Sequence, residues 1–419
     1  MKKFLFITLV IFIFAQNSFS AYILIPMDDS QKNHLKSYGL TYWTLEHGDE
    51  SWWLLNYRGG SFMLYYKKDI EKECIIRNIS YEIIADAQKE QIFNEISSPS
   101  VNMDAVKLEK APRIAIYTPP FSQPWDDAVM LALTYAEIPF DKIYDRDILL
   151  GKLKDYDWLH LHHEDFTGQY GKFYGAYGRM KWYKDQQTNS EAEAKDLGFN
   201  KVSQLKLAIA KEIKSYVAEG GFLFAMCSAT DSFEIALAAE GVDICESVFD
   251  GDSSDPEAQK KLNYNNCLAF TNFTLVKNPL EYEYSDIDVT NGRKVSDKQD
   301  YFTLFEFSAK WDPIPTMLCQ NHANLIHGFM GQTTAFKSSL LKSNVLVMGE
   351  NKTLEEVKYI HSEFGKGMWT FYGGHDPEDY RHYVGDENTD INLYSNSPGY
   401  RLILNNVLFP AAKKKKLKT

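Results

Sequence analysis

The chain has 419 residues and a formal net charge of −12 at neutral pH, and 44% of its residues are hydrophobic. This length predicts a large α/β domain with a smaller companion rather than one small core. The acidic balance argues against a nucleic-acid partner, because binding phosphates requires a basic surface. We therefore expect a small-molecule substrate. We predict no cofactor, and the sequence leaves the oligomeric state open.

The N-terminus has the three regions of a secretory signal peptide. Met1-Lys2-Lys3 precede the apolar run FLFITLVIFIF, and small residues follow at Ser18 and Ser20. The alternative is an uncleaved membrane anchor, but an apolar run of about a dozen residues is short for a span of about 20. No later segment is apolar enough to cross a bilayer. Once residues 1–20 are removed, we expect a periplasmic or secreted protein without a stable membrane span.

Residues 21–108 are predicted to form a small β-rich N-terminal domain. Its expected strands are rich in β-branched and aromatic residues, and Gly48-Asp49 and Gly59-Gly60 supply turns between them. No chemical constellation occurs in this part, so binding or shielding of the second domain is the role we expect. The expected strands are 22–25, 40–45, 52–57 and 61–66.

Residues 109–410 alternate between strand and helix patterns, which predicts an α/β domain built on a parallel sheet with flanking helices. Residues 250–322 are acidic and turn-rich, and we interpret them as insertions. Residues 411–419 form a basic tail that we expect to be a frayed, solvated end. The expected strands are 114–117, 140–144, 156–163, 222–226, 344–348 and 367–372, and the expected helices are 125–138, 205–218 and 400–408.

Cys227 lies at a sharp corner in the stretch GGFLFAMCSATDSFEIALAAEG, residues 220–241. A continuously apolar strand precedes it, and Thr230 or Asp231 can cap a helix that begins within a few residues. A strand-to-helix turn this tight tolerates little bulk on either side, and both flanking positions are alanines, Ala225 and Ala229. The pattern predicts a softened nucleophile elbow in which the helix N-terminus stabilises a thiolate. The alternative is a buried structural thiol.

A cysteine nucleophile needs a base, and His375 is the first choice for that role. Gly373 and Gly374 precede His375 and allow a tight turn, and Asp376 or Glu378 can orient the imidazole ring. His163 with Glu164 is the second choice. The alternative for His375 is a turn histidine that holds its loop by hydrogen bonds.

Four polar residues, His162, His163, Glu164 and Asp165, follow the strand predicted at 156–163. Ligands of open α/β sheets bind outside the carboxyl ends of the strands, so this cluster is a candidate substrate site together with Ser228 and Asp231. Imidazole and carboxylate groups also suit zinc or iron. Adjacent strand residues point to opposite faces, however, so the four can meet one ion only if the strand ends there.

The segment 166–183 is dense in glycines and aromatic residues, with Tyr170 and Tyr174 among its rings. It follows the proposed site directly. A mobile flap lined by rings would exclude water, and flat aromatic faces suit sugars and other amphipathic ligands. The alternative is an Ω-type loop that packs on its own rings.

The five cysteines, at positions 74, 227, 245, 267 and 319, are an odd number in a compartment that permits disulfides. If Cys227 is free, the other four can form two bridges in three ways. The alternative is that all five are reduced and buried as small hydrophobic residues.

Residues 220–231, GGFLFAMCSATD, and 364–378, FGKGMWTFYGGHDPE, resemble the two signature segments of the ThuA-like (trehalose-utilisation) family. That family belongs to the class I glutamine amidotransferase-like superfamily, and the resemblance covers roughly residues 110 to 410. It implies a flavodoxin-like fold, with Cys227 as nucleophile and His375 as base. ThuA-like proteins usually have histidine at the position of Cys227, whereas amidotransferases have their nucleophilic cysteine there. Amidotransferases place an acid two residues after the histidine, where this chain has Pro377, so Asp376 and Glu378 compete for the third role.

The whole chain also resembles exported bacterial proteins labelled asparagine synthetase B. The motifs do not support that activity. The mature chain would start at Ala21 and not at a catalytic cysteine, and the chain has no SGGxDS nucleotide loop. The sequence therefore predicts an exported, amidotransferase-like protein that acts as a cysteine-dependent hydrolase or amidase on a small or carbohydrate-derived substrate. A non-catalytic carbohydrate-binding protein and a metal-dependent sugar-processing enzyme are the alternatives.

Overall fold

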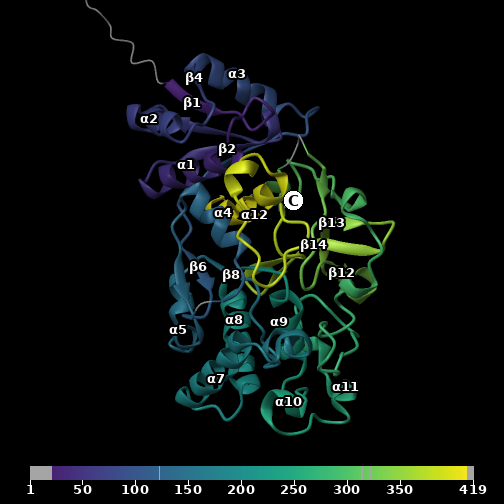
Figure 1. The fold of residues 1–419 in the computed structure, drawn as a ribbon. Helices are drawn as coiled ribbons and strands as arrows, with labels where there is room; N and C mark the ends of the chain where they lie inside the picture. The colour runs from purple at the N-terminus through teal and green to yellow at the C-terminus, as the bar shows by residue number, and fades with distance from the viewer. Residues whose placement is uncertain (1–20, 122, 313–314, 320–322, 413–419) are drawn as a thin grey trace, which may run out of the picture.

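A computed structural model describes residues 21–121, 123–312, 315–319 and 323–412. The predicted signal peptide and the lysines of the basic tail lie outside the described residues. The chain folds into a small N-terminal sheet with three helices and a larger mixed sheet with helices on both faces (Figure 1). Among the described residues, no helix combines the length and the apolar character that a membrane span requires.

The N-terminal sheet has five antiparallel strands in the order β4-β1-β3-β2-β5. Three helices accompany it, so this unit is less purely β-structured than predicted. Its elements are β1 (Ala21–Ile25), α1 (His34–Glu46), β2 (Ser51–Leu55), β3 (Ser61–Tyr65), α2 (Lys68–Ile76), β4 (Glu82–Ala85), α3 (Asp86–Ser97) and β5 (Asp104–Leu108).

The strand predicted at 40–45 is wrong, because these residues belong to helix α1. Asn33 caps the helix by accepting a hydrogen bond from the Lys36 backbone N–H at 2.9 Å. Tyr38 and Tyr42 favour strands by intrinsic propensity, but here both are buried in the core, where Tyr38 packs against Trp53 and Phe62 of β2 and β3. Burial of most of the helix in the core outweighs the weak local preference for strand.

The large sheet has a parallel half and an antiparallel half, so the prediction of a parallel sheet is correct only in part. The parallel strands lie in the order β7-β6-β8-β9-β15, and β14, β13, β10 and β11 extend the sheet in antiparallel fashion beyond β15. The strands are β6 (Ile114–Tyr117), β7 (Asp141–Ile143), β8 (Trp158–Leu161), β9 (Phe222–Met226), β10 (Tyr301–Leu304), β11 (Leu325–His327), β12 (Phe336–Lys337), β13 (Leu346–Asn351), β14 (Glu356–Phe364) and β15 (Gly367–Tyr372).

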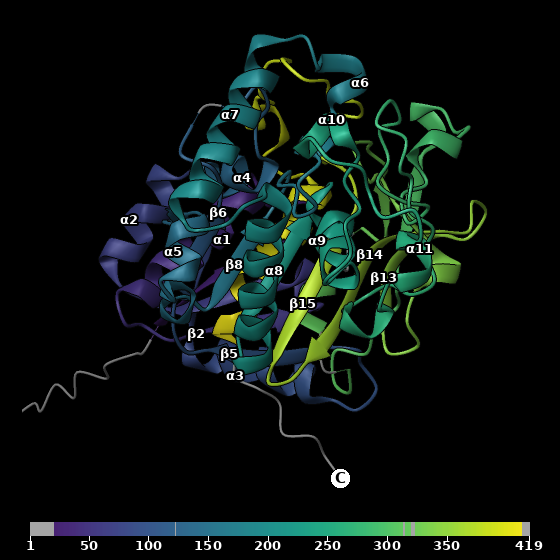
Figure 2. The same cartoon turned by 90° about the horizontal axis from the view of Figure 1, so that it is seen from below.

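Helices cover both faces of this sheet, with α8 and α9 on one side and α4 and α12 on the other (Figure 2). The helices of this part are α4 (Ala128–Ala136), α5 (Asp145–Leu149), α6 (Tyr174–Tyr177), α7 (Lys181–Asp196), α8 (Val202–Glu219), α9 (Ala229–Ala238), α10 (Ser247–Asp250), α11 (Ala258–Lys261) and α12 (Pro398–Leu408). Residues 250–300 consist mainly of turns and short helical segments, as the acidic, turn-rich sequence predicted.

Strand β9 is continuously apolar because both of its faces are buried. Phe222, Phe224 and Met226 belong to the core shared with α4 and α12, whereas Leu223 and Ala225 belong to the core beneath α8 and α9. A parallel strand buried on both faces needs apolar residues at every position. The rigid strand therefore delivers Cys227 to the carboxyl edge of the sheet.

The two sheets share one core, because α1 packs on α4 and α12. Arg401 of α12 is fully buried. Its guanidinium group donates to the Tyr38 hydroxyl at 2.9 Å and to the backbone carbonyls of Met27 and Gly59. The N-terminal unit thus supplies hydrogen-bond acceptors that a buried charge in the larger part requires.

All five cysteines are free and buried, in agreement with the alternative in which they are reduced and packed as small hydrophobic residues. Cys74, Cys245 and Cys267 pack in the cores, and Cys319 lies near Gly60 of the N-terminal unit. The disulfide alternative is therefore wrong for this structure.

Candidate functional site

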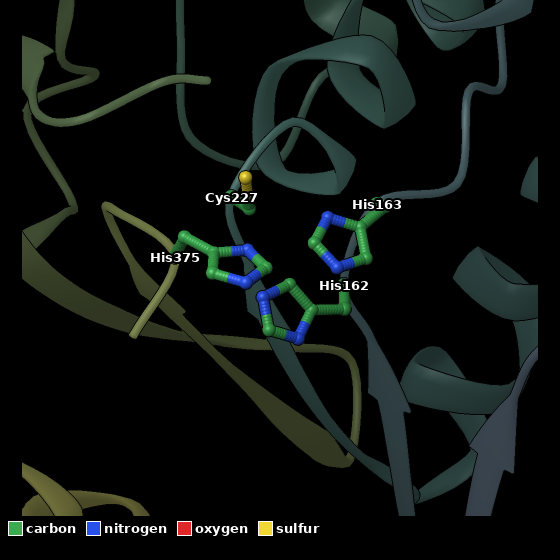
Figure 3. Close-up of side chains that lie close together, drawn as sticks. All are labelled: His162, His163, Cys227 and His375. Carbon is green, nitrogen blue, oxygen red and sulfur yellow. The ribbon is translucent and has the colours of Figure 1, made fainter. Parts of the chain in front are cut away.

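The candidate site lies at the carboxyl ends of four neighbouring strands. Asp126 and Asp127 follow β6, His162 and His163 follow β8, Cys227 follows β9, and His375 follows β15. Figure 3 shows the three imidazole rings grouped beside Cys227. One ligand atom from each of His162, His163, Cys227 and His375 lies within 4.8 Å of the others.

Cys227 adopts a left-handed backbone conformation, with φ of 51°, between the last residue of β9 and Ser228 at the start of α9. This conformation is strained for a side chain with a Cβ atom and occurs at nucleophile elbows. The side chain is 2% exposed, and its thiol donates to the Gln332 carbonyl at 3.0 Å. Burial raises the pKa of Cys227 to about 12, so the resting site holds a thiol rather than a thiolate.

His375 is held by a carboxylate that the sequence did not indicate. Its Nε2 atom lies 2.9 Å from Oδ1 of Asp126, and both side chains are buried. Burial alone would raise the pKa of Asp126, but the hydrogen bond and charge of His375 hold that pKa below its usual value. The other ring nitrogen, Nδ1, points toward Cys227 and His163 in Figure 3. The predicted turn is present, since Gly374 has a φ of 89°.

Neither residue expected to orient His375 contacts its ring nitrogens. Both carboxylate oxygens of Asp376 accept from the Tyr400 hydroxyl, at 2.8 and 2.7 Å, and Asp376 also accepts from the Glu378 backbone N–H. The Glu378 carboxylate is directed to Ser397. Asp376 and Glu378 instead anchor the loop to α12, because they bond Tyr400 of that helix and Ser397, its N-cap.

His162 and His163 lie with their rings stacked, with centroids 4.0 Å apart. The Nδ1 atom of His162 lies 3.1 Å from Oδ1 of Asp127, and Nε2 of His163 bonds the Asp126 carbonyl at 2.6 Å. Burial lowers the pKa of His162 to about 4 and holds that of His163 well below its usual value. Both imidazoles are therefore neutral at neutral pH. His160 is a core histidine and bonds the Phe224 carbonyl.

The remaining residues predicted to bind substrate divide into two groups. Glu164 and Asp165 line a pocket next to His163, although Oε2 of Glu164 also accepts from the His162 backbone N–H at 3.0 Å. Ser228 and Asp231 are buried structural groups. The Ser228 hydroxyl donates to the His163 carbonyl, and Asp231 accepts from the Thr333 hydroxyl at 2.9 Å. These two side chains position the loops around the site.

The pocket beside His163 lies between the loops that follow β6 and β8. Tyr170 belongs to its lining, whereas Tyr174 lies on α6 and packs against Phe249. The lining residues are Pro119, Phe121, Gln123, Trp125, Tyr144, His163, Glu164, Asp165, Gly168, Tyr170, Gln186, Ser190, Val202 and Lys206. Aromatic walls and carboxylates make it suitable for a small polar molecule.

The aromatic segment 166–183 packs on its own rings and its neighbours. Phe173 contacts Trp125 and Trp182, with ring centroids 5.2 and 5.7 Å apart. Lys172 is buried and donates to the carbonyls of Val276 and Asn278 at 2.7 and 3.0 Å. These contacts favour the Ω-type loop over the mobile flap.

Sequence reasoning missed Asp126, Asp127, His382 and Gln332. The sequence predicts a helix over 125–138, but the helix begins at Ala128. Asp127 is its N-cap and accepts from the backbone N–H groups of Val129 at 2.8 Å and Met130 at 3.0 Å. An aspartate pair that follows a strand and precedes a helical pattern was the available signal. His382 carried none, since its place 3.4 Å from Asp126 depends on the fold.

Comparisons with known proteins do not identify the chain. No family model matches it, and no curated protein matches it. Among solved structures, the chain is similar to the cytoplasmic protein STM3548 from Salmonella typhimurium, with a TM-score of 0.34 and 9% identity. It is also similar to the cytoplasmic protein STM1381 from Salmonella typhimurium LT2, with a TM-score of 0.32 and 12% identity. Each alignment covers 72% of this chain and 100% of the other. A β-galactosidase from Bacillus circulans sp. alkalophilus has a TM-score of 0.25 and 10% identity, with coverage of 63% and 29%. These low TM-scores give no ground for assigning a function.

Proposed function

We propose that the protein is a cysteine-dependent hydrolase or amidase of the amidotransferase-like, ThuA-like type, which acts outside the cytoplasm on a small, carbohydrate-derived substrate. The observation that carries the proposal is the left-handed corner at Cys227 beside His375, whose other nitrogen is held by Asp126. A nucleophile, a base and an orienting acid are the three parts of such a catalytic centre.

The order of the parallel strands supports this proposal. Numbered along the chain, β7, β6, β8, β9 and β15 lie in the order 2-1-3-4-5, which is the order of flavodoxin-like folds. In such sheets, ligands bind at the carboxyl edge where the strand order reverses, here between β6 and β8. Asp126 follows β6 and His163 follows β8, so the pocket beside His163 lies at this place.

In the proposed reaction, Cys227 gives its proton to Nδ1 of His375 as sulfur attacks the substrate carbonyl carbon. Transfer in the same step is needed because the resting thiol has a pKa of about 12. The tetrahedral intermediate, stabilised by backbone N–H groups at Ser228 and nearby, collapses to a thioester, and the leaving amine or alcohol takes the proton from His375. Water then attacks the thioester and gives one proton to His375. The acid product leaves, and that proton returns to sulfur.

The test is turnover of a panel of small amides and esters, including sugar-derived ones, by the wild-type chain and by Cys227→Ser. We expect hydrolysis, a trapped acyl group on Cys227 by intact mass, and a loss of at least about 10³-fold in the variant. Cys245→Ser is the matched control, because Cys245 is also a buried thiol bonded to a carbonyl, at 3.3 Å from Thr167. No turnover of any substrate by the wild type, or equal turnover by both variants, overturns the proposal.

A second candidate is a carbohydrate-binding protein without turnover, which the pocket walled by Trp125 and Tyr170 beside Glu164 and Asp165 favours. Carboxylates that accept hydroxyl protons and flat rings that cover apolar faces are typical of sugar sites. Calorimetric binding of a sugar that is lost in Trp125→Ala, with no product formed over hours, would support this candidate against the hydrolase.

A further inference from the structure

Three imidazoles and one thiol converge at the candidate site, which is more ligating capacity than a cysteine–histidine pair requires. The ligand atoms of His162, His163, Cys227 and His375 all lie within 4.8 Å of one another. They come from the ends of β8, β9 and β15, which are adjacent in the sheet. Imidazole nitrogen and cysteine sulfur are the ligand types that zinc sites use.

His163 and His375 are each fixed by a hydrogen bond through one nitrogen, and His162 has one nitrogen beside a carboxylate. His375 is held at Nε2 by Asp126 at 2.9 Å, His163 at Nε2 by the Asp126 carbonyl at 2.6 Å, and His162 has Nδ1 3.1 Å from Asp127. Figure 3 shows Nδ1 of His163 and of His375 on the side of Cys227, and Nε2 of His162 beside the His375 ring. Metal-ligating histidines typically bond a carboxylate or carbonyl through the second nitrogen in this way.

The His162 ring supplies an independent observation. Its Nε2 atom is buried and has no hydrogen-bond partner among the described residues, and the side chain is 1% exposed. A buried polar atom without a partner is costly and is rare in folded proteins. A bound cation in the centre of the cluster would satisfy it.

We propose that His162, His163, Cys227 and His375 form a binding site for a divalent transition-metal ion, and that zinc is the ion that this ligand set fits. Imidazole nitrogen and thiolate sulfur suit zinc, whereas magnesium and calcium prefer oxygen ligands. On binding, a metal–sulfur bond forms and the thiol proton is released to solvent, so no oxidant or reductant is needed. Asp126 and Asp127 are the carboxylates behind the ligands.

Metal occupancy and nucleophilic use of Cys227 exclude each other, because the same sulfur serves both. The inference therefore goes beyond the proposed hydrolase and adds a regulatory consequence that rests on it. A loaded site would inhibit thiol-dependent turnover, and chelation would restore it. Metal binding itself requires no substrate, so it can be established or refuted whether or not the hydrolase exists.

The experiment titrates the full mature chain, freed of metal with a chelator, with Zn²⁺ by calorimetry and with Co²⁺ by absorption. We expect one ion per chain, with Co²⁺ giving the visible bands of a tetrahedral site and a near-ultraviolet thiolate-to-cobalt band. Cys227→Ser should lose the near-ultraviolet band while keeping its far-ultraviolet circular dichroism. His162→Ala should weaken Zn²⁺ binding by more than about 100-fold, and Asp126→Asn by about 10- to 100-fold.

His327→Ala is the matched control, because that imidazole is 41% exposed and lies elsewhere, beside Asp297. We expect it to bind both ions like the wild type. Wild-type chain without tetrahedral cobalt bands, or a near-ultraviolet band that survives Cys227→Ser, would overturn the site. Binding that falls in His327→Ala but not in His162→Ala would identify a surface site and overturn it equally.

Discussion

At the scale of single residues, the candidate centre depends on which carboxylate reaches which imidazole. Asp126 reaches His375 across 249 positions of sequence, while Asp376, the immediate neighbour of His375, bonds Tyr400. A loop residue is positioned by what surrounds it in space, so proximity in sequence was a poor guide to the orienting acid. The two aspartates therefore make a matched pair of substitutions.

Asp126→Asn should reduce hydrolysis by about 10²- to 10⁴-fold, because the amide no longer stabilises the imidazolium that forms during proton transfer. The measurement is kcat/KM on whichever substrate the wild type turns over, with circular dichroism to verify folding. Asp376→Asn should leave kcat/KM within a few-fold of wild type and lower the melting temperature instead. If both variants lost kcat/KM equally and kept their stability, the assignment of the orienting role to Asp126 would be wrong.

Because Lys358 is buried, we expect the free energy of unfolding of the protein to depend on pH. Burial, with repulsion from Arg293, lowers its pKa to about 7, and its ammonium group donates to the Phe329 and Thr334 carbonyls. Between pH 7 and pH 10 the unfolded chain therefore binds more protons at this residue than the folded chain does. Stability contributed by Lys358 must rise with pH across that window.

We expect the free energy of unfolding of the wild type, relative to Lys358→Met, to rise by up to about 4 kcal/mol from pH 7 to pH 10. Urea denaturation at several pH values measures it. Taking the difference removes the contribution of other lysines, such as buried Lys172. Lys352→Met is the control, because that side chain is 84% exposed, and its difference from wild type should not vary with pH. If the difference in unfolding free energy between wild type and Lys358→Met did not change with pH, the lowered pKa of Lys358 would be contradicted.

At the scale of elements, helix α12 connects the two parts of the molecule. All of its residues after Pro398 are buried, and it packs on α1, on α4 and beneath the sheet. Pro398 at its first turn and Ser397 as N-cap, accepting from the Tyr400 backbone N–H, explain why the sequence predicted this helix well. Protein surrounds the helix on all sides, and its buried polar side chains, Arg401, Asn405 and Asn406, are hydrogen-bonded inside the core.

Leu404→Ala in α12 should destabilise the protein by about 2–5 kcal/mol, because it leaves a cavity at a fully buried position. Leu393→Ala, at a leucine that is 74% exposed, should change stability by less than about 0.5 kcal/mol. Chemical denaturation of both variants provides the comparison. Similar losses in the two would mean that α12 does not lie in the core.

At the scale of the whole molecule, the N-terminal unit and the larger part share one hydrophobic core rather than meeting at a polar interface. The boundary predicted near residue 108 falls between β5 and β6. Across it, Tyr38 bonds both Arg401 and Asn405. We infer that the unit stabilises the site-bearing part, in line with the shielding role expected from the sequence.

A chain that begins at residue 109 should therefore fail to fold into a soluble monomer, because it would expose the apolar faces of α4 and α12 and leave buried Arg401 without the acceptors at Met27, Tyr38 and Gly59. Expression of this fragment, followed by size exclusion and a thermal melt, tests the expectation. A monomer with a sharp melt would show that the N-terminal unit is dispensable.

Local sequence determined the parts of this protein that local physics controls. Apolar runs predicted strands such as β9 and β15, the alanines around Cys227 predicted a tight corner, and paired glycines predicted the turn before His375. The sequence also predicts that His162, His163, Cys227 and His375 lie at the carboxyl ends of strands. The carboxyl ends of parallel strands lie at the same edge of a sheet. These inferences need only neighbours along the chain.

Only the tertiary structure decided which of these groups meet and what surrounds them. The antiparallel half of the sheet, the helix at 34–46, the link from Asp126 to His375 and the high pKa of Cys227 all depend on residues far apart in sequence. Long-range packing outweighs local propensity, and burial sets the charge state of a thiol, because both act through the completed core.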